Sequence, residues 1–189
     1  MGRIVATEYV SLDGVVQAPG GYEDFEHAGW VFEVDRGSEG EKFKLDETLN
    51  SEALLMGRLT YKVFAASWPS MEGEFADKFN SMPKYVVTTT LEEPLGWNNS
   101  AVLEGDPLEE IKKLRQRLDG DIVIHGSPQL VQMLLEHDLI DEMRVMLFPV
   151  VLGTGKRLFG ASNDKTRLRL TDLKSVGDGI AILIYEPAA

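Results

Sequence analysis

A short stretch of the sequence, residues 56–61, carries the side chains best suited to bind an anionic ligand. Gly57 allows a ligand to approach the backbone closely, Arg58 carries a planar guanidinium that forms paired hydrogen bonds with phosphate, and Thr60 adds a hydroxyl. An apolar run precedes Gly57 and a helical pattern follows it, so a strand should turn into a helix here. Because the N-terminus of a helix attracts anions, the stretch predicts a phosphate site.

Two other segments are suited to further parts of a nucleotide. His125, Gly126 and Ser127 follow an apolar run and precede a helix whose free amides and positive end could meet a pyrophosphate. A serine before a proline is also typical of simple helix capping, and that alternative stays open. Residues 88–90, all threonine, end another apolar run. Their hydroxyls could contact a ribose or its phosphate, or they could be ordinary β-branched residues of an edge strand.

The sequence lacks the patterns of several other kinds of site. There is no cysteine, so a disulfide, a thiolate nucleophile and a thiolate metal site are excluded. The three histidines, His27, His125 and His137, do not have metal-ligand spacing, and no metal is expected. The glycine-rich run at 153–157 lacks the spacing and the hydroxyl residue of a P-loop, and no G-x-S-x-G nucleophile elbow occurs.

The charge balance disfavours two classes of binding partner. The 189-residue chain has 31 acidic and 19 basic side chains and a formal net charge of -12, which repels nucleic acid and anionic membrane surfaces. No stretch approaches the length of a membrane span, and the first five residues lead into a strand-like pattern without an apolar signal core. Together with the lack of cysteine, these features predict a cytoplasmic protein.

Alternating strand and helix patterns surround the candidate segments. Helices are expected at 39–50, from about 59, at 74–80, from Pro107 with Asp106 as its cap, and from Pro128. Strands are expected at 3–10, 53–56, 84–90, 121–125, 141–151, 167–175 and 180–186, of which the last two form a hairpin. This order predicts one three-layer α/β domain over residues 1–189, with a mostly parallel central sheet and antiparallel C-terminal strands.

Five short motifs occur in the order and spacing of a known family. They are SLDG at 11–14, MGR followed by TY at 56–61, HGS at 125–127, LIDE at 139–142, and PVVLGTG followed by LF at 149–159. Together they resemble the family that joins dihydrofolate reductase to the reductase domain of bacterial riboflavin biosynthesis. The last two motifs are more similar to the riboflavin branch. The resemblance covers almost the whole chain and implies the dihydrofolate-reductase-like form of the α/β fold.

The same resemblance implies an NADPH site. It places Arg58 and Thr60 at the cofactor phosphates, and a guanidinium near the ribose favours the 2′-phosphorylated cofactor. It places Gly126 and Ser127 under the pyrophosphate. Relatives carry a Gly-Gly pair where this chain has His125 and Gly126. The remaining cofactor-binding positions that the resemblance implies are Gly57, Thr88, Thr89, Thr90 and Gln129.

Two carboxylates are candidates for a catalytic role. By comparison with dihydrofolate reductase, the substrate-binding carboxylate of the family falls near Glu41, on the helix expected at 39–50. Glu41 lies among Glu39, Lys42 and Lys44, so a solvated helix face is the alternative. Asp13 is the second candidate, although an Asp-Gly pair is equally typical of a turn.

These features predict an oxidoreductase that transfers a hydride from NADPH to a small heterocyclic substrate, similar to 5-amino-6-(5-phosphoribosylamino)uracil reductase. The deaminase that is often fused to riboflavin-pathway reductases would need Cys and His-x-Glu signatures, which this chain lacks. Dihydrofolate reductase proper and a non-catalytic nucleotide-binding module on the same fold are the alternatives. The resemblance also implies a homodimer, and the apolar run at 145–148 is compatible either with its interface or with a buried central strand.

Overall fold

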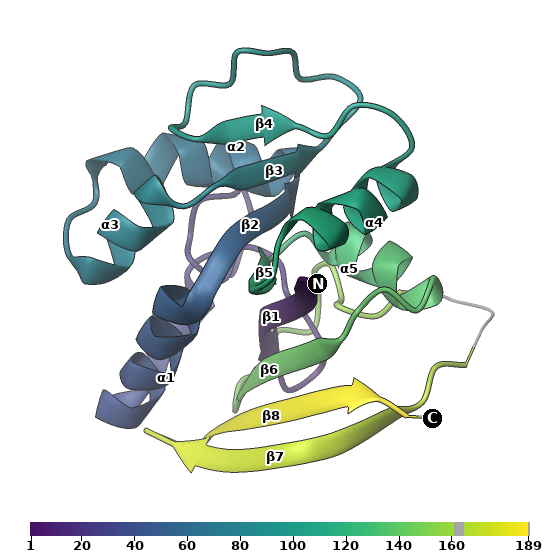
Figure 1. Cartoon of the computed structure of the whole chain (residues 1–189). Helices are drawn as coiled ribbons and strands as arrows, with labels where there is room; N and C mark the ends of the chain where they lie inside the picture. Colours follow the sequence, from purple (N-terminus) through teal and green to yellow (C-terminus); the bar gives the residue numbers. More distant parts are fainter. Residues whose placement is uncertain (161–164, 189) are drawn as a thin grey trace.

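A twisted β-sheet runs through the computed structural model, which describes residues 1–160 and 165–188 (Figure 1). Within these residues the strand order is β4-β3-β2-β5-β1-β6-β8-β7. Neighbouring strands from β4 across to β6 are parallel, whereas β8 pairs antiparallel with both β6 and β7. The strands are β1 (Arg3–Ser11), β2 (Ser51–Gly57), β3 (Lys84–Val87), β4 (Ser100–Val102), β5 (Asp121–His125), β6 (Glu142–Phe148), β7 (Leu168–Val176) and β8 (Ile180–Pro187).

Helices cover both faces of this sheet. On one face, apolar side chains of α4 and α5 pack against β1 and β5; on the other, α2 and α3 pack against β2 and β3, and α1 lies beside α3 (Figure 1). The predicted α/β fold, with its parallel centre and antiparallel C-terminal strands, is confirmed. The helices are α1 (Gly37–Asn50), α2 (Arg58–Ser67), α3 (Glu74–Ser81), α4 (Pro107–Arg117) and α5 (Pro128–Glu136), with short 3₁₀ turns η1 (Trp30–Glu33) and η2 (Trp68–Ser70).

The central strand β1 is buried on both faces. Ile4, Ala6 and Val10 belong to the core under α4 and α5, whereas Tyr9 packs in the core on the α1 side. Side chains alternate along a strand, so Glu8 lies on the same face as Ile4, Ala6 and Val10. An acidic residue at such a position is unusual and concerns the site described below.

A buried group of charged side chains fastens α1 to the sheet. Lys44 donates hydrogen bonds to Thr7 Oγ1 at 2.8 Å and to Glu47 Oε1 at 2.5 Å. Glu47 also contacts Arg144 of β6, with 3.3 Å between Oε2 and Nη1. Burial acts to raise the pKa of Glu47, but the charges of Lys44 and its other neighbours outweigh burial and lower that pKa. The Glu47 carboxylate therefore stays ionised in a buried ion pair in which both charges have hydrogen-bond partners.

Several element ends differ from the sequence predictions. β3 ends at Val87 rather than residue 90, because Thr88 Oγ1 accepts hydrogen bonds from the backbone N–H groups of Thr90 and Leu91 and turns the chain. β6 ends at Phe148 rather than residue 151, before a proline that has no N–H for the ladder. β4 was not expected, since its three half-buried residues carry no alternating pattern.

The apolar run at 145–148 lies within β6, between β1 and β8. Val145, Met146 and Phe148 are buried inside the chain itself. Burial in a central strand therefore accounts for this run without a second subunit, and the predicted homodimer receives no support from it.

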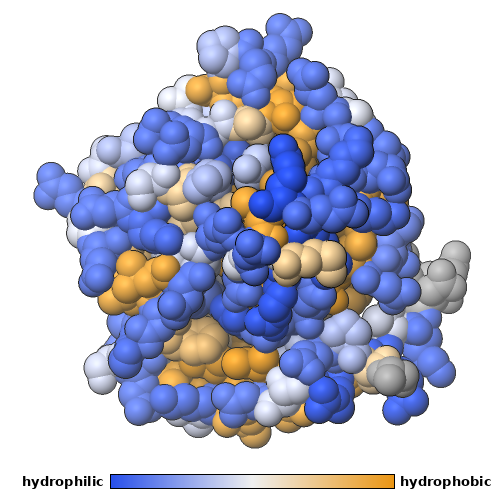
Figure 2. All heavy atoms as spheres, in the orientation of Figure 1, coloured by the Kyte–Doolittle hydropathy of each residue, from blue (hydrophilic) through white to orange (hydrophobic). Residues whose placement is uncertain are grey.

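Polar and charged side chains cover most of the face shown in Figure 2, and apolar atoms show between them in separate patches. The exposed edge strand β7 contributes two of the exposed large apolar residues, Leu170 and Leu173. None of the helices in the described part of the chain combines the length and apolarity that a membrane crossing needs.

The turn of the C-terminal hairpin packs directly against the start of α1. Gly177 has a φ of +51°, and a Cβ atom there would overlap Asp35 O and lie 2.5 Å from the carbonyl carbon of Arg36. The next residue, Asp178, donates its backbone N–H to Asp35 O at 2.8 Å. Only glycine fits this contact, which positions Arg36 beside the cavity described below.

Replacing Gly177 with alanine should therefore destabilise the protein by more than about 2 kcal/mol, because positive φ and backbone overlap act together. Gly179→Ala is the matched control: its φ is +92°, but the nearest atom to an added Cβ is 4.0 Å away, so only about 1–2 kcal/mol of backbone strain is expected. Denaturant unfolding measures both free energies, and equal losses would contradict the packing argument.

Candidate active site

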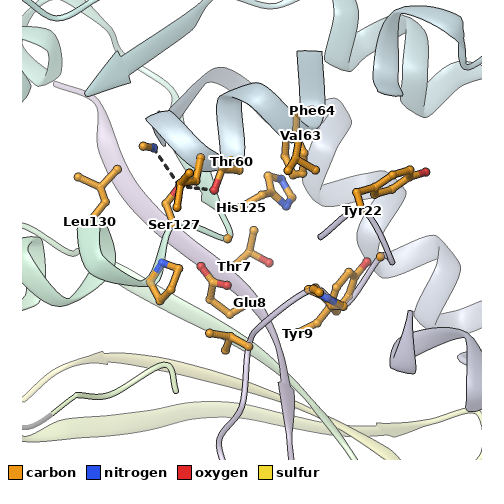
Figure 3. Close-up of a pocket in the computed structure, with 18 of the residues that line it drawn as sticks. Thr7, Glu8, Tyr9, Tyr22, Thr60, Val63, Phe64, His125, Ser127 and Leu130 are labelled. Carbon is orange, nitrogen blue, oxygen red and sulfur yellow. Dashed lines mark hydrogen bonds between the residues drawn. The ribbon is translucent and has the colours of Figure 1, made fainter. Parts of the chain in front are cut away.

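A cavity of about 1050 Å³ opens at the carboxyl ends of β1, β2, β3 and β5. This edge is where parallel α/β sheets bind ligands, because strand-to-helix turns present backbone N–H groups there. The volume is at the upper limit of the roughly 300–1,000 Å³ typical of small-molecule sites, so a nucleotide and a second small molecule have room together. Figure 3 shows side chains from β1, α2 and the β5–α5 turn that converge on it.

Two helices begin at the cavity without a side-chain cap. At α2 the capping position is Gly57, and at α5 it is Ser127, and neither side chain caps its helix. The simple capping alternative for Ser127 is therefore wrong. Its hydroxyl instead accepts a hydrogen bond from Gly57 N at 2.9 Å and donates one to Thr60 Oγ1 at 2.8 Å (Figure 3). The free amides of both helix starts thus remain available to an anion.

The backbone between β5 and α5 is left-handed at two successive residues, with φ of +65° at Gly126 and +57° at Ser127. A Cβ atom on Gly126 would lie 3.4 Å from Thr60 Oγ1, so glycine leaves a narrow space between this turn and α2. The sequence has one glycine here rather than two, and the close approach of the two turns is achieved with that one.

The other predicted cofactor positions are distributed around the same cavity. Arg58, Thr88, Thr89 and Gln129 line it, and the Arg58 guanidinium makes no hydrogen bond or ion pair within the described residues. Thr90 does not line the cavity. The hydroxyl of Thr88 already accepts the hydrogen bonds that turn the chain after β3, which leaves it fewer free positions for a ligand.

The two predicted carboxylates lie in different places. Glu41 lines the cavity at its mouth, where its exposed carboxylate pairs with Arg36 at 2.9 Å. Asp13 does not line the cavity. Ser11 Oγ, Leu152 N and Gly153 N all donate to the Asp13 carboxylate, and the Ser11 hydrogen bond is the main cause that lowers its pKa to about 2. Asp13 therefore connects the turn after β1 to the loop that follows β6.

Glu8 is an acidic residue of the cavity that the sequence analysis missed. It is only 4% exposed, and its Oε1 has no hydrogen-bond partner in the described part of the chain. Burial raises the pKa of Glu8 well above its ordinary value, although Lys44 and the Gly126 N–H act in the opposite direction. An acid inside the apolar run of residues 3–10 was the available signal, because such strands are buried on both faces.

His125 contributes the other partnerless buried atom of the cavity, since its Nε2 makes no hydrogen bond in residues 1–160 and 165–188. Burial, together with the charge of Lys44, lowers the pKa of His125 to about 3, so the imidazole is neutral at physiological pH. Its ring packs edge-on against Phe79 at 5.1 Å between centroids. A neutral imidazole of this kind can form one hydrogen bond with a ligand through Nε2.

Aromatic side chains form the wall of the cavity beyond His125. Phe64, Trp68 and Phe75 are half-buried there, and Trp68 stacks on Phe75 with 5.2 Å between centroids. Trp68, the first residue of η2, follows Arg58, the first residue of α2, by ten residues, which corresponds to about 15 Å of helix. The cavity thus has an end with free amides and a guanidinium, and a separate end suited to a flat apolar group.

Comparison with known proteins agrees with this geometry. A family model for the RibD C-terminal domain matches residues 3–182. The chain belongs to this family. It is a family of reductases, and membership supports an oxidoreductase of the RibD and dihydrofolate reductase type. The resemblance that the five motifs indicate is confirmed.

Individual relatives of this RibD-type chain span its full length. It is 27% identical to the Bacillus subtilis protein YyaP over 190 residues, which cover 97% of this chain and 94% of YyaP. It is similar in structure to a putative riboflavin biosynthesis protein from Shewanella, with a TM-score of 0.76, 22% identity and 99% of each chain covered. Dihydrofolate reductase from Enterococcus faecalis, solved with NADP(H), has the same fold, with a TM-score of 0.60, 13% identity and coverage of 100% and 98%.

The Ser127 hydroxyl is open to a direct test. Ser127→Ala leaves the Gly57 N–H without its partner, and a loss of about 1–3 kcal/mol in the free energy of unfolding is expected. Thr60→Val is the matched variant: it removes one hydroxyl partner but keeps the bond between Ser127 and Gly57, so its cost should be smaller. Denaturant unfolding measures both free energies. If Thr60→Val lowered the free energy of unfolding as much as Ser127→Ala, the hydrogen bond to Gly57 would not be the main contribution.

Proposed function

We propose that this protein is an NADPH-dependent reductase that transfers a hydride to a small heterocyclic substrate, similar to 5-amino-6-(5-phosphoribosylamino)uracil reductase. One observation carries the proposal: two helices without side-chain caps and a guanidinium without a partner in the described residues face one cavity. Free amides and a free cation are what a dinucleotide phosphate needs. Bound NADPH would supply the hydride.

The residues present fit the phosphates of this cofactor. The N–H groups at the starts of α2 and α5 would bind the pyrophosphate, with Gly126 leaving room for it between the two turns. Arg58 would bind the 2′-phosphate, while Thr88 and Thr89 would lie near the adenosine. NADP(H) in the Enterococcus faecalis enzyme of the same fold supports this assignment.

The aromatic end of the cavity would hold the acceptor. A flat heterocycle can stack on Trp68 and Phe75 and form a hydrogen bond with the neutral imidazole of His125. The reduced acceptor also takes up a proton, for which water at the mouth or the Glu41 carboxyl is the source in this proposal. This part of the site excludes bulk water through its apolar wall.

Titration of the purified protein with NADPH and with NADH, followed by fluorescence, tests the proposal. Binding of NADPH, and its consumption with a pyrimidine such as 5-amino-6-(5-phosphoribosylamino)uracil, is the expected result. Consumption with dihydrofolate alone would instead identify a dihydrofolate reductase. Tight binding without turnover of either compound would favour a non-catalytic nucleotide-binding module, and failure of both cofactors to bind would exclude an oxidoreductase of this type.

Arg58→Ala should weaken the binding of NADPH about tenfold to a hundredfold and leave NADH nearly unchanged, because the lost hydrogen bonds go to a phosphate that NADH lacks. Arg169→Ala is the control, since this exposed arginine pairs with Glu186 on the C-terminal hairpin. Fluorescence titrations give the dissociation constants of NADPH and NADH for the native protein and for both variants. Equal losses for both cofactors would place Arg58 at the pyrophosphate instead.

Two further features stay predictions. The homodimer that the family resemblance implies is tested by sedimentation of the full chain. The cytoplasmic location follows from composition, and fractionation of cells that express the protein tests it.

A further inference from the structure

Glu8 is a buried acid that the proposed cofactor and acceptor contacts leave unused. It lines the cavity and is drawn in Figure 3 below Ser127 and beside Thr7. Its Oε1 is buried without a hydrogen-bond partner in the described residues. Buried polar atoms nearly always have partners, so an apolar side chain would fill this position at lower cost unless a ligand completes the hydrogen bond.

The position of Glu8 follows from the sheet. The parallel pairing of β1 with β5 ends at Thr7 opposite His125, which is also the last residue of β5. Glu8 is therefore the first residue of β1 beyond that pairing, where the two strands stop sharing hydrogen bonds. The Glu8 carboxyl therefore lines the cavity at this edge of the sheet, next to Gly126, whose N–H favours the ionised form of Glu8.

The groups around Glu8 favour its neutral form. Burial raises its pKa, and Glu47 on α1 adds to this, whereas Lys44 on α1 and the Gly126 N–H lower it. Lys44 is the stronger of the two groups that lower it, but its ammonium donates to Thr7 and Glu47, makes no hydrogen bond to Glu8 and does not outweigh burial. A protonated carboxylic acid is therefore the form that faces the cavity.

We infer that Glu8 binds the carboxamide of the nicotinamide ring, an inference that rests on the proposed function. A neutral carboxylic acid presents an O–H donor and a C=O acceptor side by side, and a primary carboxamide presents the complementary acceptor and donor. The adenine edge also carries a donor beside an acceptor, but 2′-phospho-ADP-ribose keeps the adenine and lacks the carboxamide, so the two groups can be distinguished. The carboxyl also lies next to Gly126, so it would remain neutral beside the pyrophosphate, where a carboxylate would be repelled.

Two cofactor probes separate this contact from the phosphate contacts. NADPH carries the carboxamide, whereas 2′-phospho-ADP-ribose carries the same phosphates without it. Glu8→Leu should weaken NADPH at least tenfold and leave 2′-phospho-ADP-ribose unchanged. Glu8→Gln should keep NADPH within a few-fold of the native affinity, because the amide side chain still offers a donor and an acceptor. Isothermal titration of the full chain measures each dissociation constant.

The affinity should also depend on pH with a definite sign. As pH rises through the raised pKa of Glu8, the acid loses its O–H donor, and the NADPH affinity should fall relative to that of 2′-phospho-ADP-ribose. Both probes carry the 2′-phosphate, so its titration changes both affinities alike and cancels in their ratio. In Glu8→Gln the ratio should be constant with pH, and in Glu186→Gln, whose carboxylate pairs with Arg169 on the C-terminal hairpin, it should vary as in the native protein.

The outcomes distinguish the two proposals. If neither probe binds, the proposed function fails. If both bind and Glu8→Leu weakens them equally or not at all, or if the native ratio does not change with pH, the Glu8 inference is overturned while the proposed function stands. Infrared spectra of the native protein and Glu8→Gln at neutral pH give a check without ligand: the native protein should show one more protonated carboxyl, and its absence would overturn the inference even if Glu8→Leu does not fold.

Discussion

The hydroxyl of Ser127 is the contact on which the geometry of the cavity depends. It joins the turn after β5 to the turn after β2, two strands that are neighbours in the sheet, through Gly57 N and Thr60 Oγ1. Because the hydroxyl is used across the turns, it does not cap α5, and the left-handed backbone at residues 126–127 carries it away from that helix. Two helix starts with free amides consequently face the same space.

The side of the cavity next to α1 depends on the buried ion pair between Lys44 and Glu47. Lys44 and Glu47 hold α1 against Thr7 of β1 and Arg144 of β6. Removal of Glu47 would leave the Lys44 ammonium buried without a carboxylate, and removal of Lys44 would leave Glu47 with Arg144 alone. The same arrangement commits the Lys44 ammonium to Glu47. Lys44 still lowers the pKa of Glu8, one residue along β1 from Thr7, but burial outweighs it and raises that pKa. The structural ion pair thus also acts on an acid that lines the cavity.

The sequence predicts the features that depend on local pattern. The alternation of strands and helices, the Asp106 cap, which accepts a hydrogen bond from Glu109 N at 3.0 Å, and the antiparallel C-terminal hairpin are each encoded within a few residues. Features that depend on partners far away in the sequence cannot be predicted in this way. Ser127 reads as an ordinary cap because its actual partner, Gly57, is 70 residues away. The early end of β3 depends on a threonine side chain turning its own backbone, which a run of β-branched residues does not indicate.

The two ends of the cavity also differ in how far the sequence alone predicts them. The end with free amides is built from backbone N–H groups, one glycine and one guanidinium, so it follows from motifs that are readable in the sequence and compatible with the fold shared by dihydrofolate reductase at 13% identity. The aromatic end is built from side chains of α2, η2, α3 and β5 that meet only after folding. Because a fold by itself does not determine an activity, in the proposed function the identity of the acceptor would depend on this second set of side chains.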